Sequence, residues 1–326
     1  MKRIITCAAL IAAILCFTIF SGCKTPQTLS SKSAVTREKV SEAGNGKLVL
    51  YFIDLDVPKD SKDKSGDSTL VVSPDGKIML IDCGHPDAGK DVIKTLDALG
   101  ITKIDMFVMS HPHIDHLGAF PLVASRFPIG LVYRSRLEYD TQYMRAFEEA
   151  VKNRRIPVEY LEEGDSFLFG DKVKVEVFGP EHEIVYPKNY PSNSTQFVND
   201  NSVTMMLIYG ESKALFGGDL YRSGETVILD KYKDRLKCDV AKVNHHALST
   251  SSKRGWIKAT RPQIAVAMND VLGSMDVVND YVKNGARFYH TLYNGSVKIE
   301  LDDKCNIVTV TAEKESWIEK LPEKAK

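Results

Sequence analysis

Cysteine is too sparse in this chain for a disulfide framework or a cysteine-based metal site. Three of the six cysteines lie within the first 23 residues, so only Cys83, Cys238 and Cys305 belong to the main body of the chain. An odd number argues against complete pairing, and their spacing matches no Cys-x-x-Cys motif. We expect Cys83 and Cys238, which stand at the edges of apolar runs, to be small buried residues.

The chain also lacks an excess of charge of either sign. It contains 43 basic and 43 acidic residues, which gives a formal net charge of +0. Such a balance provides no general attraction to nucleic acid or to anionic lipid. It weighs against a dedicated nucleic-acid-binding protein, although a local basic groove is compatible with it. The sequence also contains no short repeat and no low-complexity segment.

The first residues have the pattern of a targeting segment. A basic start at residues 1–3 precedes an apolar run at residues 4–20, which is typical of a signal peptide. The run is followed by Ser21-Gly22-Cys23, which resembles a bacterial lipobox, in which the cysteine is lipidated and becomes the first mature residue. We therefore predict a lipoprotein signal peptide at residues 1–22 and an extracytoplasmic bacterial protein anchored to a membrane through lipid on Cys23. A transmembrane anchor and ordinary secretion are the alternatives.

The remainder divides into a tether, one domain and a tail. Residues 23–47 are rich in Ser, Thr, Lys and Glu without an apolar period, which predicts a flexible tether, and residues 313–326 form a charged tail. Residues 48–312 suffice for a single domain with a substantial core. Strand and helix signals alternate along them, which favours an α/β fold with two sheets and helices outside. The pattern alone also allows other α/β architectures.

Histidine is scarce but strongly clustered. Of eight histidines, three lie in the hexapeptide His111-Pro112-His113-Ile114-Asp115-His116, directly after an apolar run at residues 104–109 that predicts a buried strand. Imidazole and carboxylate are ligand types that suit zinc and related ions. Several protonated imidazoles in one turn would repel each other, and a bound cation removes that problem. The hexapeptide thus predicts a metal site on a loop after a strand; surface-loop histidines are the alternative.

The His-x-His-x-Asp-His pattern is similar to the signature of the metallo-β-lactamase superfamily. Two later segments fit the same family, namely Ala-Leu-Phe-Gly-Gly-Asp-Leu at residues 214–220 and Asp-Val-Ala-Lys-Val-Asn-His-His at residues 239–246. The sequence around these segments resembles a branch of that superfamily, the hydrolase domain of ComEC-type DNA-uptake proteins and the choline-phosphate esterases of bacterial surfaces. This resemblance implies an αββα sandwich with the metal site on loops at one edge of the sheets.

The resemblance also assigns roles to individual residues. It implies two divalent ions, with zinc expected and manganese as the alternative. One ion is expected on His111 and His113, the second on Asp115, His116 and His245, with Asp219 bridging both. His246 would point away from His245 at a strand end, so it is expected to support the ligands or face the substrate. Asp115, Asp219 and His246 are the expected catalytic residues, and Asp82 is expected to brace the histidine loop without binding metal.

The sequence departs from the family pattern in two places. Many members carry a further histidine before the bridging aspartate, whereas this chain has Asn-Asp-Asn-Ser at residues 199–202. One ion would then be held by two histidines and the bridge, with an asparagine oxygen as a further candidate. In addition, Ala247-Leu248 replaces the Gly-Ser of the ComEC-type pattern, and the later Gly-His-Pro is missing. These changes make a small phosphodiester as plausible a substrate as DNA.

The expected function is hydrolysis. Two neighbouring ions lower the pKa of a shared water, so that hydroxide forms near neutral pH and attacks the substrate. We expect a phosphodiesterase that acts outside the cytoplasm on a small molecule, a cell-surface polymer or DNA. Hydrolysis of a lactone, amide or thioester is the alternative within the same fold, and a catalytically inactive surface-binding lipoprotein is the non-enzymatic one. No protein partner is evident from the sequence.

Overall fold

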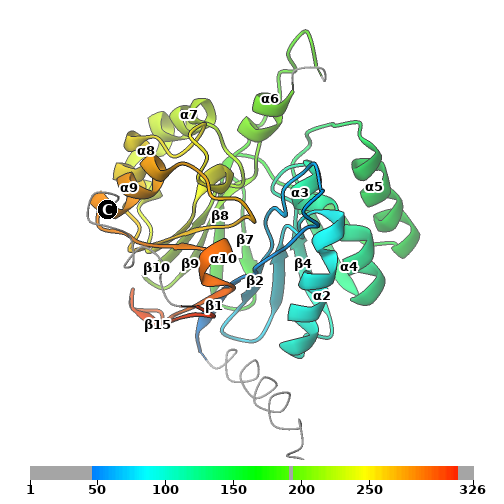
Figure 1. The fold of residues 1–326 in the computed structure, drawn as a ribbon, viewed down its shortest axis with the longest axis horizontal. Helices are drawn as coiled ribbons and strands as arrows, with labels where there is room; N and C mark the ends of the chain where they lie inside the picture. Colours follow the sequence, from blue (N-terminus) through cyan, green and yellow to red (C-terminus); the bar gives the residue numbers. More distant parts are fainter. Residues whose placement is uncertain (1–45, 191–193, 315–326) are drawn as a thin grey trace, which may run out of the picture.

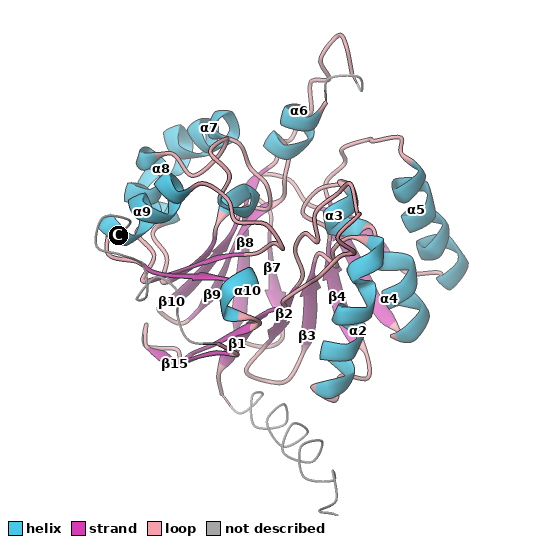
Figure 2. Cartoon of the chain, in the orientation of Figure 1, coloured by secondary structure: helices cyan, strands magenta, loops and turns pink. Residues whose placement is uncertain are grey.

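Two β-sheets lie face to face in the computed structural model, with helices on both outer surfaces (Figures 1 and 2). The structure describes residues 46–190 and 194–314. The predicted signal peptide, Cys23 with its predicted lipidation, nearly all of the predicted tether and most of the predicted tail lie outside these residues. Within the described part of the chain, no helix combines the length and apolar character needed to cross a membrane.

The first sheet has eight strands in the order β15-β14-β1-β2-β3-β4-β5-β6. The strands β3, β4 and β5 are parallel, whereas β1 pairs antiparallel with β2 and β14. Their bounds are β1 (Leu48–Phe52), β2 (Thr69–Val72), β3 (Ile78–Ile81), β4 (Ile104–Val108), β5 (Ile129–Arg134), β6 (Val158–Tyr160), β14 (Val297–Leu301) and β15 (Ile307–Ala312).

The second sheet has seven strands in the order β13-β12-β11-β10-β9-β8-β7. The strands β10 to β13 are parallel to one another, and β7, β8, β9 and β10 pair antiparallel in sequence. Their bounds are β7 (Ser166–Phe169), β8 (Val173–Gly179), β9 (Thr204–Tyr209), β10 (Ser212–Phe216), β11 (Val240–Lys242), β12 (Ile264–Ala267) and β13 (Arg287–His290).

Longer helices cover the outer faces of the sheets. On the first sheet these are α2 (Gly89–Ala98), α4 (Phe120–Arg126) and α5 (Gln142–Arg154), and on the second they are α7 (Arg222–Tyr232), α8 (Arg254–Thr260) and α9 (Met275–Lys283) (Figure 1). Shorter helical turns are η1 (Pro86–Ala88), α3 (Ile114–Leu117), α6 (Thr195–Asp200), η2 (Lys233–Leu236), η3 (Asn244–Ala247) and α10 (Thr291–Asn294).

Strand β1 illustrates why the chain folds into layers. Leu48, Leu50 and Phe52 pack into the apolar layer between the sheets, whereas Val49 packs into the layer under the first group of helices. Successive side chains of a strand point to opposite faces, so a strand with apolar residues at both parities is covered on both faces. This arrangement is the predicted αββα sandwich.

The carboxyl ends of the parallel strands of both sheets lie at one edge of the sandwich. Asp82 follows β3, the histidine hexapeptide follows β4, Asp219 follows β10, and the His245-His246 pair follows β11. Loops at the carboxyl ends of parallel strands are where open α/β sheets bind ligands. The sequence-predicted residues therefore meet at one edge, although they come from different sheets.

Candidate metal centre

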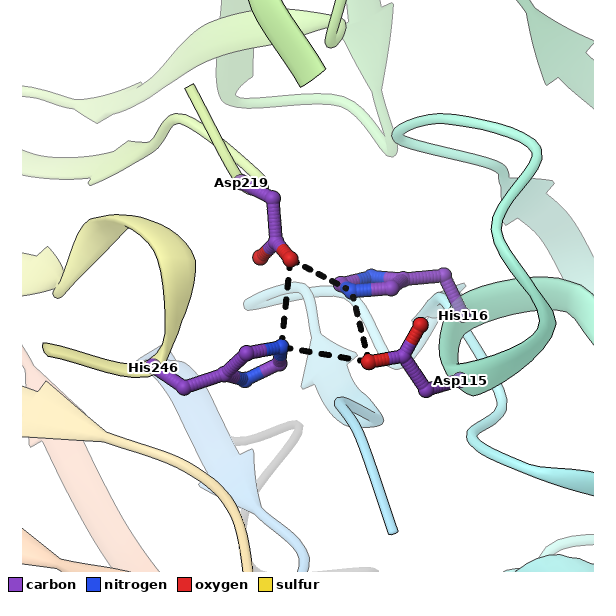
Figure 3. Close-up of side chains that lie close together, drawn as sticks. All are labelled: Asp115, His116, Asp219 and His246. Atoms are coloured by element: carbon purple, nitrogen blue, oxygen red, sulfur yellow. Dashed lines mark ion pairs between the residues drawn. The ribbon is translucent and has the colours of Figure 1, made fainter. Parts of the chain in front are cut away.

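Four side chains converge on one point, namely Asp115, His116, Asp219 and His246 (Figure 3). The Nε2 atom of His246 lies 3.1 Å from Asp219 Oδ2 and 3.3 Å from Asp115 Oδ2. The Nε2 atom of His116 lies 3.3 Å from Asp219 Oδ2 and 3.9 Å from Asp115 Oδ2. We call these four residues the quartet.

The spacing of the quartet suits a tetrahedral ion. Ligands bound to one zinc ion at about 2.0–2.1 Å stand about 3.3 Å apart at the corners of a tetrahedron. The four measured separations run from 3.1 to 3.9 Å, close to that value. Two imidazole nitrogens and two carboxylate oxygens are also a donor set that zinc accepts. The residues therefore fit a divalent ion.

Both quartet histidines are held in the tautomer that a metal requires. His116 Nδ1 lies 2.8 Å from Asp82 Oδ2, and His246 Nδ1 lies 2.9 Å from the Met268 carbonyl oxygen and 3.1 Å from Asp67 Oδ1. A proton on each Nδ1 leaves the lone pair on Nε2. Both Nε2 atoms are buried and form ion pairs with the carboxylates of the quartet, so a cation bound there would have these four groups as ligands.

Asp82 has the bracing position that the sequence comparison implied. Its carboxylate accepts hydrogen bonds from the Ser110 backbone N–H at 2.8 Å and from the Ser110 hydroxyl at 2.6 Å, in addition to His116. Burial raises the pKa of this carboxyl, although His116 and Ser110 oppose the rise. Asp82 thus fixes the start of the histidine loop as well as one ligand of the quartet.

His111 and His113 form a second donor pair beside the quartet. His111 Nε2 and His113 Nδ1 lie 3.0 Å apart, and His111 Nε2 lies 3.9 Å from Asp219 Oδ2. Burial lowers the pKa of both imidazoles, and for His111 the value falls well below its ordinary range, in part through the neighbouring His116. Neutral imidazoles have a free lone pair, so this pair is suited to a second ion that shares Asp219.

The His245-His246 pair reverses the expected order. His246 belongs to the quartet, whereas His245, which we expected as the ligand, lies with its Nε2 3.8 Å from Asp219 Oδ2 and its Nδ1 2.5 Å from Thr250 Oγ1. The expectation assumed alternation at a strand end. However, β11 ends at Lys242, and both histidines have left-handed backbone angles, with φ of 45° and 54°. His245 therefore turns toward the cavity described below, and burial lowers its pKa to about 4.

Two residues that the sequence interpretation missed, Lys242 and Asp67, contact the residues of the centre. Lys242 Nζ forms an ion pair with Asp67 Oδ2, donates to the Gly218 carbonyl oxygen at 2.8 Å, and lies 3.3 Å from Asp219 Oδ1. Burial opposes the charged lysine, but Asp67 and Asp219 outweigh it and raise the lysine pKa. A charged residue inside the apolar strand β11 was the available sequence signal.

A cavity of about 460 Å³ opens at the centre. His113, Asp115, Asp219 and His245 line its inner end. Its remaining wall includes cationic, acidic, aromatic and amide side chains, namely Lys62, Asp63, Lys64, Tyr139, Tyr143 and Asn199. An anionic substrate of modest size would find both positive charge and apolar surface there.

The other three histidines take no part in this cluster. His85 is buried and accepts a hydrogen bond from the Asp87 backbone N–H at 3.2 Å, as the cap of η1. The exposed His182 pairs with Glu162 at 2.5 Å. His290 accepts a hydrogen bond from the Leu292 backbone N–H at 3.3 Å.

The chain is similar to known proteins in sequence and in fold. Residues 62–184 match the model of the metallo-β-lactamase superfamily. The chain is 24% identical over 220 residues to competence protein ComA of Neisseria gonorrhoeae, which covers 67% of this chain and 28% of that protein. It is 25% identical over 226 residues to ComE operon protein 3 of Bacillus subtilis, with 62% and 26% covered. The chain thus spans only about a quarter of the length of these two relatives.

Two further matches extend over most of the compared protein. A UPF0173 protein of Pyrococcus furiosus is 28% identical over 208 residues, covering 63% of this chain and 80% of that protein. The metallo-β-lactamase fold protein YhfI from Bacillus subtilis superposes with a TM-score of 0.51 at 11% identity, covering 78% of this chain and all of that one. With the histidine motif and the sandwich fold, these matches show that the chain contains a metallo-β-lactamase domain segment at residues 62–184 and has the fold of metallo-β-lactamase proteins.

Proposed function

We propose that this protein is a phosphodiesterase that uses two divalent ions and acts outside the cytoplasm, anchored by lipid on Cys23. The observation that carries the proposal is the position of Asp219 Oδ2. It lies 3.1 Å and 3.3 Å from the quartet nitrogens of His246 and His116, and 3.9 Å from His111 Nε2 in the neighbouring pair. One carboxylate oxygen thus stands between two groups of ligands, which is the arrangement that a shared bridge requires.

The residues around the cavity have distinct tasks in such a reaction. Two bound ions would supply Lewis-acid activation of the attacking water and of the phosphoryl oxygens. Asp219 is held in place through its second oxygen by Lys242, and Asp82 and Asp67 fix the rings of His116 and His246. His245 and the lysines at the cavity mouth, Lys62 and Lys64, would contact the anionic substrate.

The ligand count favours phosphodiesters over lactones. The quartet supplies four side chains to one position, whereas the His111–His113 pair supplies two and shares the bridge. An ion with few protein ligands keeps positions open for substrate oxygens. A phosphodiester has two non-bridging oxygens for such positions, and a lactone, amide or thioester presents one carbonyl. Hydrolysis of those carbonyl compounds is the second candidate.

The cavity favours a small substrate or a single unit of a polymer. One relative is named a competence protein, but a cavity of about 460 Å³ has the size of a small-molecule site. The net charge of +0 provides no general attraction to DNA. We therefore propose a small or surface-linked phosphodiester ahead of a nucleic acid.

The test compares substrates at saturating zinc or manganese. The purified protein should hydrolyse bis(p-nitrophenyl) phosphate at least about tenfold faster than p-nitrophenyl phosphate, a chromogenic lactone, a chromogenic β-lactam or single-stranded DNA. Asp219→Ala should lose bound metal and hydrolysis together, whereas Asp97→Ala, at an exposed surface pair, should lose neither. Rapid lactone cleavage with no phosphodiester turnover would show the proposed reaction to be wrong.

A further inference from the structure

The His111–His113 position has fewer charged or imidazole donors than the quartet beside it. The two imidazole nitrogens face each other at 3.0 Å, and the shared Asp219 Oδ2 is 3.9 Å from His111 Nε2. Among the described residues, the clusters of histidine, cysteine and carboxylate side chains centre on His116 and do not include this pair. An amide oxygen is also a metal ligand and would complete such a position.

Asn199 supplies an amide at this place. Its side chain is 1% exposed and lines the cavity together with His113 and Asp219. The amide is near enough to His113 and Tyr221 to act on the pKa of both side chains. Its Oδ1 atom is buried and has no hydrogen-bond partner. A buried acceptor without a partner is rare in native proteins and requires a reason.

The local structure explains why Asn199, and not Asn201, faces the centre. Both residues stand at the end of α6, which has no counterpart among the elements expected from the sequence. Asn201 donates its side-chain N–H back to the Phe197 carbonyl oxygen at 2.8 Å and lines a different cavity. Asn201 is therefore a matched control, since it has the same chemistry and lies two residues away without contact with the centre.

We propose that Asn199 Oδ1 is the third side-chain ligand of the His111–His113 position, beside the bridging Asp219. This assignment rests on the proposed two-metal function and deepens it. A neutral amide oxygen is a weaker ligand for zinc than an imidazole, and oxygen ligands suit manganese and magnesium better than nitrogen ligands do. The position is therefore the weaker and more exchangeable of the two, and the one that manganese enters more readily.

The experiment measures metal binding directly. Metal-free full-length protein is titrated with zinc against a chromophoric chelator, and with cobalt(II) while the visible absorption is recorded. The wild type should bind two ions with different affinities. Asn199→Leu, which keeps the size and removes the oxygen, should weaken the weaker site by roughly tenfold or more and alter its cobalt spectrum. The tighter site should not change.

Two further variants test the opposite direction. Asn199→Asp and Asn199→His introduce stronger ligands and should tighten the weaker site by about tenfold or more, while Asn199→His should also lower phosphodiesterase activity by filling an open position. Asn201→Ala should leave both affinities unchanged. If Asn199→Leu does not fold, as judged from its thermal transition, the tightening in Asn199→Asp decides the question because that side chain has nearly the same shape.

Unchanged affinities and an unchanged cobalt spectrum in the Leu and Asp variants would overturn the assignment. The outcome for the proposed function is separate. If metal binding depends on Asn199 but the protein does not hydrolyse phosphodiesters, Asn199 is a metal ligand and the proposed phosphodiesterase function is wrong. If the protein hydrolyses phosphodiesters but binds metal independently of Asn199, the proposed function stands and the assignment of Asn199 is wrong.

Discussion

Lys242 places a buried positive charge beneath the carboxylates of the metal centre. It is 4% exposed and pairs with both Asp67 and Asp219. Removal of one partner of a buried ion pair leaves an uncompensated charge. The lysine therefore stabilises the centre before any ion binds, and its importance should be greatest in the metal-free protein.

We predict that Lys242→Met lowers the free energy of unfolding of the metal-free protein by about 3–5 kcal/mol. Excess zinc should recover part of this loss, because bound cations replace the missing positive charge next to Asp219. Urea unfolding with and without metal measures both quantities. Lys258→Met, at an exposed site on α8, is the control. An equal loss in both states would contradict the proposed role.

Part of the centre could be predicted residue by residue, and part could not. The positions of His111, His113, Asp115 and His116 are dense enough in the sequence to indicate a site, and the structure brings Asp219 and Asp82 to them. Asp67 was missed because residues 53–68 contain several other aspartates and no histidine that would single it out. The order of His245 and His246 depends on backbone angles in the left-handed region, which side-chain patterns do not reveal.

At the scale of elements, helix α7 controls the loop that carries His245 and His246. Its buried Glu225 accepts hydrogen bonds from Asn244 Nδ2 at 2.9 Å, from the Ser252 backbone N–H at 2.5 Å and from the Lys253 backbone N–H at 3.0 Å. These three contacts span the loop from end to end. The left-handed residues between them are unfavourable for L-amino acids, so the loop needs such a brace.

Glu225 also makes the brace sensitive to pH. Burial raises the pKa of its carboxyl to about 7, although the three donors oppose the rise. Since the folded pKa exceeds that of the unfolded chain, its contribution to stability is fully present below about pH 4.5 and is lost as the pH rises through about 7. The loss is on the order of 3 kcal/mol, at about 1.4 kcal/mol per pKa unit.

We predict that Glu225→Gln removes this pH dependence, because an amide does not titrate. The stability of the wild type relative to the variant should fall between pH 5 and pH 8 in urea unfolding of the metal-free proteins. Glu149→Gln, at an exposed position of α5, should keep the pH profile of the wild type. Parallel profiles for the wild type and Glu225→Gln would be inconsistent with a titrating brace.

The elements themselves were predictable to different degrees. The sequence predicts a helix at residues 142–152, and the structure has α5 at Gln142–Arg154. The amphipathic stretch at residues 118–127 predicts one helix, and the structure has α4 (Phe120–Arg126) there, preceded by the separate turn α3 (Ile114–Leu117). The sequence of helix α6 (Thr195–Asp200) has no clear apolar period, and Asn199, the residue of this helix that lines the cavity, is polar and buried.

At the scale of the whole molecule, the sandwich was not predictable from periodicity alone. Alternating strands and helices allow several α/β folds. The choice followed from the resemblance carried by the histidine motif. Sheet order depends on contacts between segments far apart in the chain, such as the pairing of β1 with β14, and no local pattern encodes such a pairing.

The proposed anchor gives a prediction about the whole protein. If Cys23 is lipidated, the protein should partition into detergent and carry acyl chains, because lipidation follows from the cysteine at the end of the signal segment. Cys23→Ser should accumulate as a precursor with the signal attached, as seen by mass spectrometry. Cleavage of this variant to the mature size of the wild type would indicate ordinary secretion.

The ligands of the quartet come from both sheets, so a bound ion affects the stability of the whole fold. Asp115 and His116 follow a strand of the first sheet, while Asp219 and His246 follow strands of the second. A bound ion is therefore a cross-link between the two halves of the sandwich. At a free metal concentration a hundred times the dissociation constant, each ion adds about 2.7 kcal/mol to the free energy of unfolding. For a protein proposed to act outside the cytoplasm, the local concentration of metal ions would then set the lifetime of the folded molecule as well as its rate of hydrolysis.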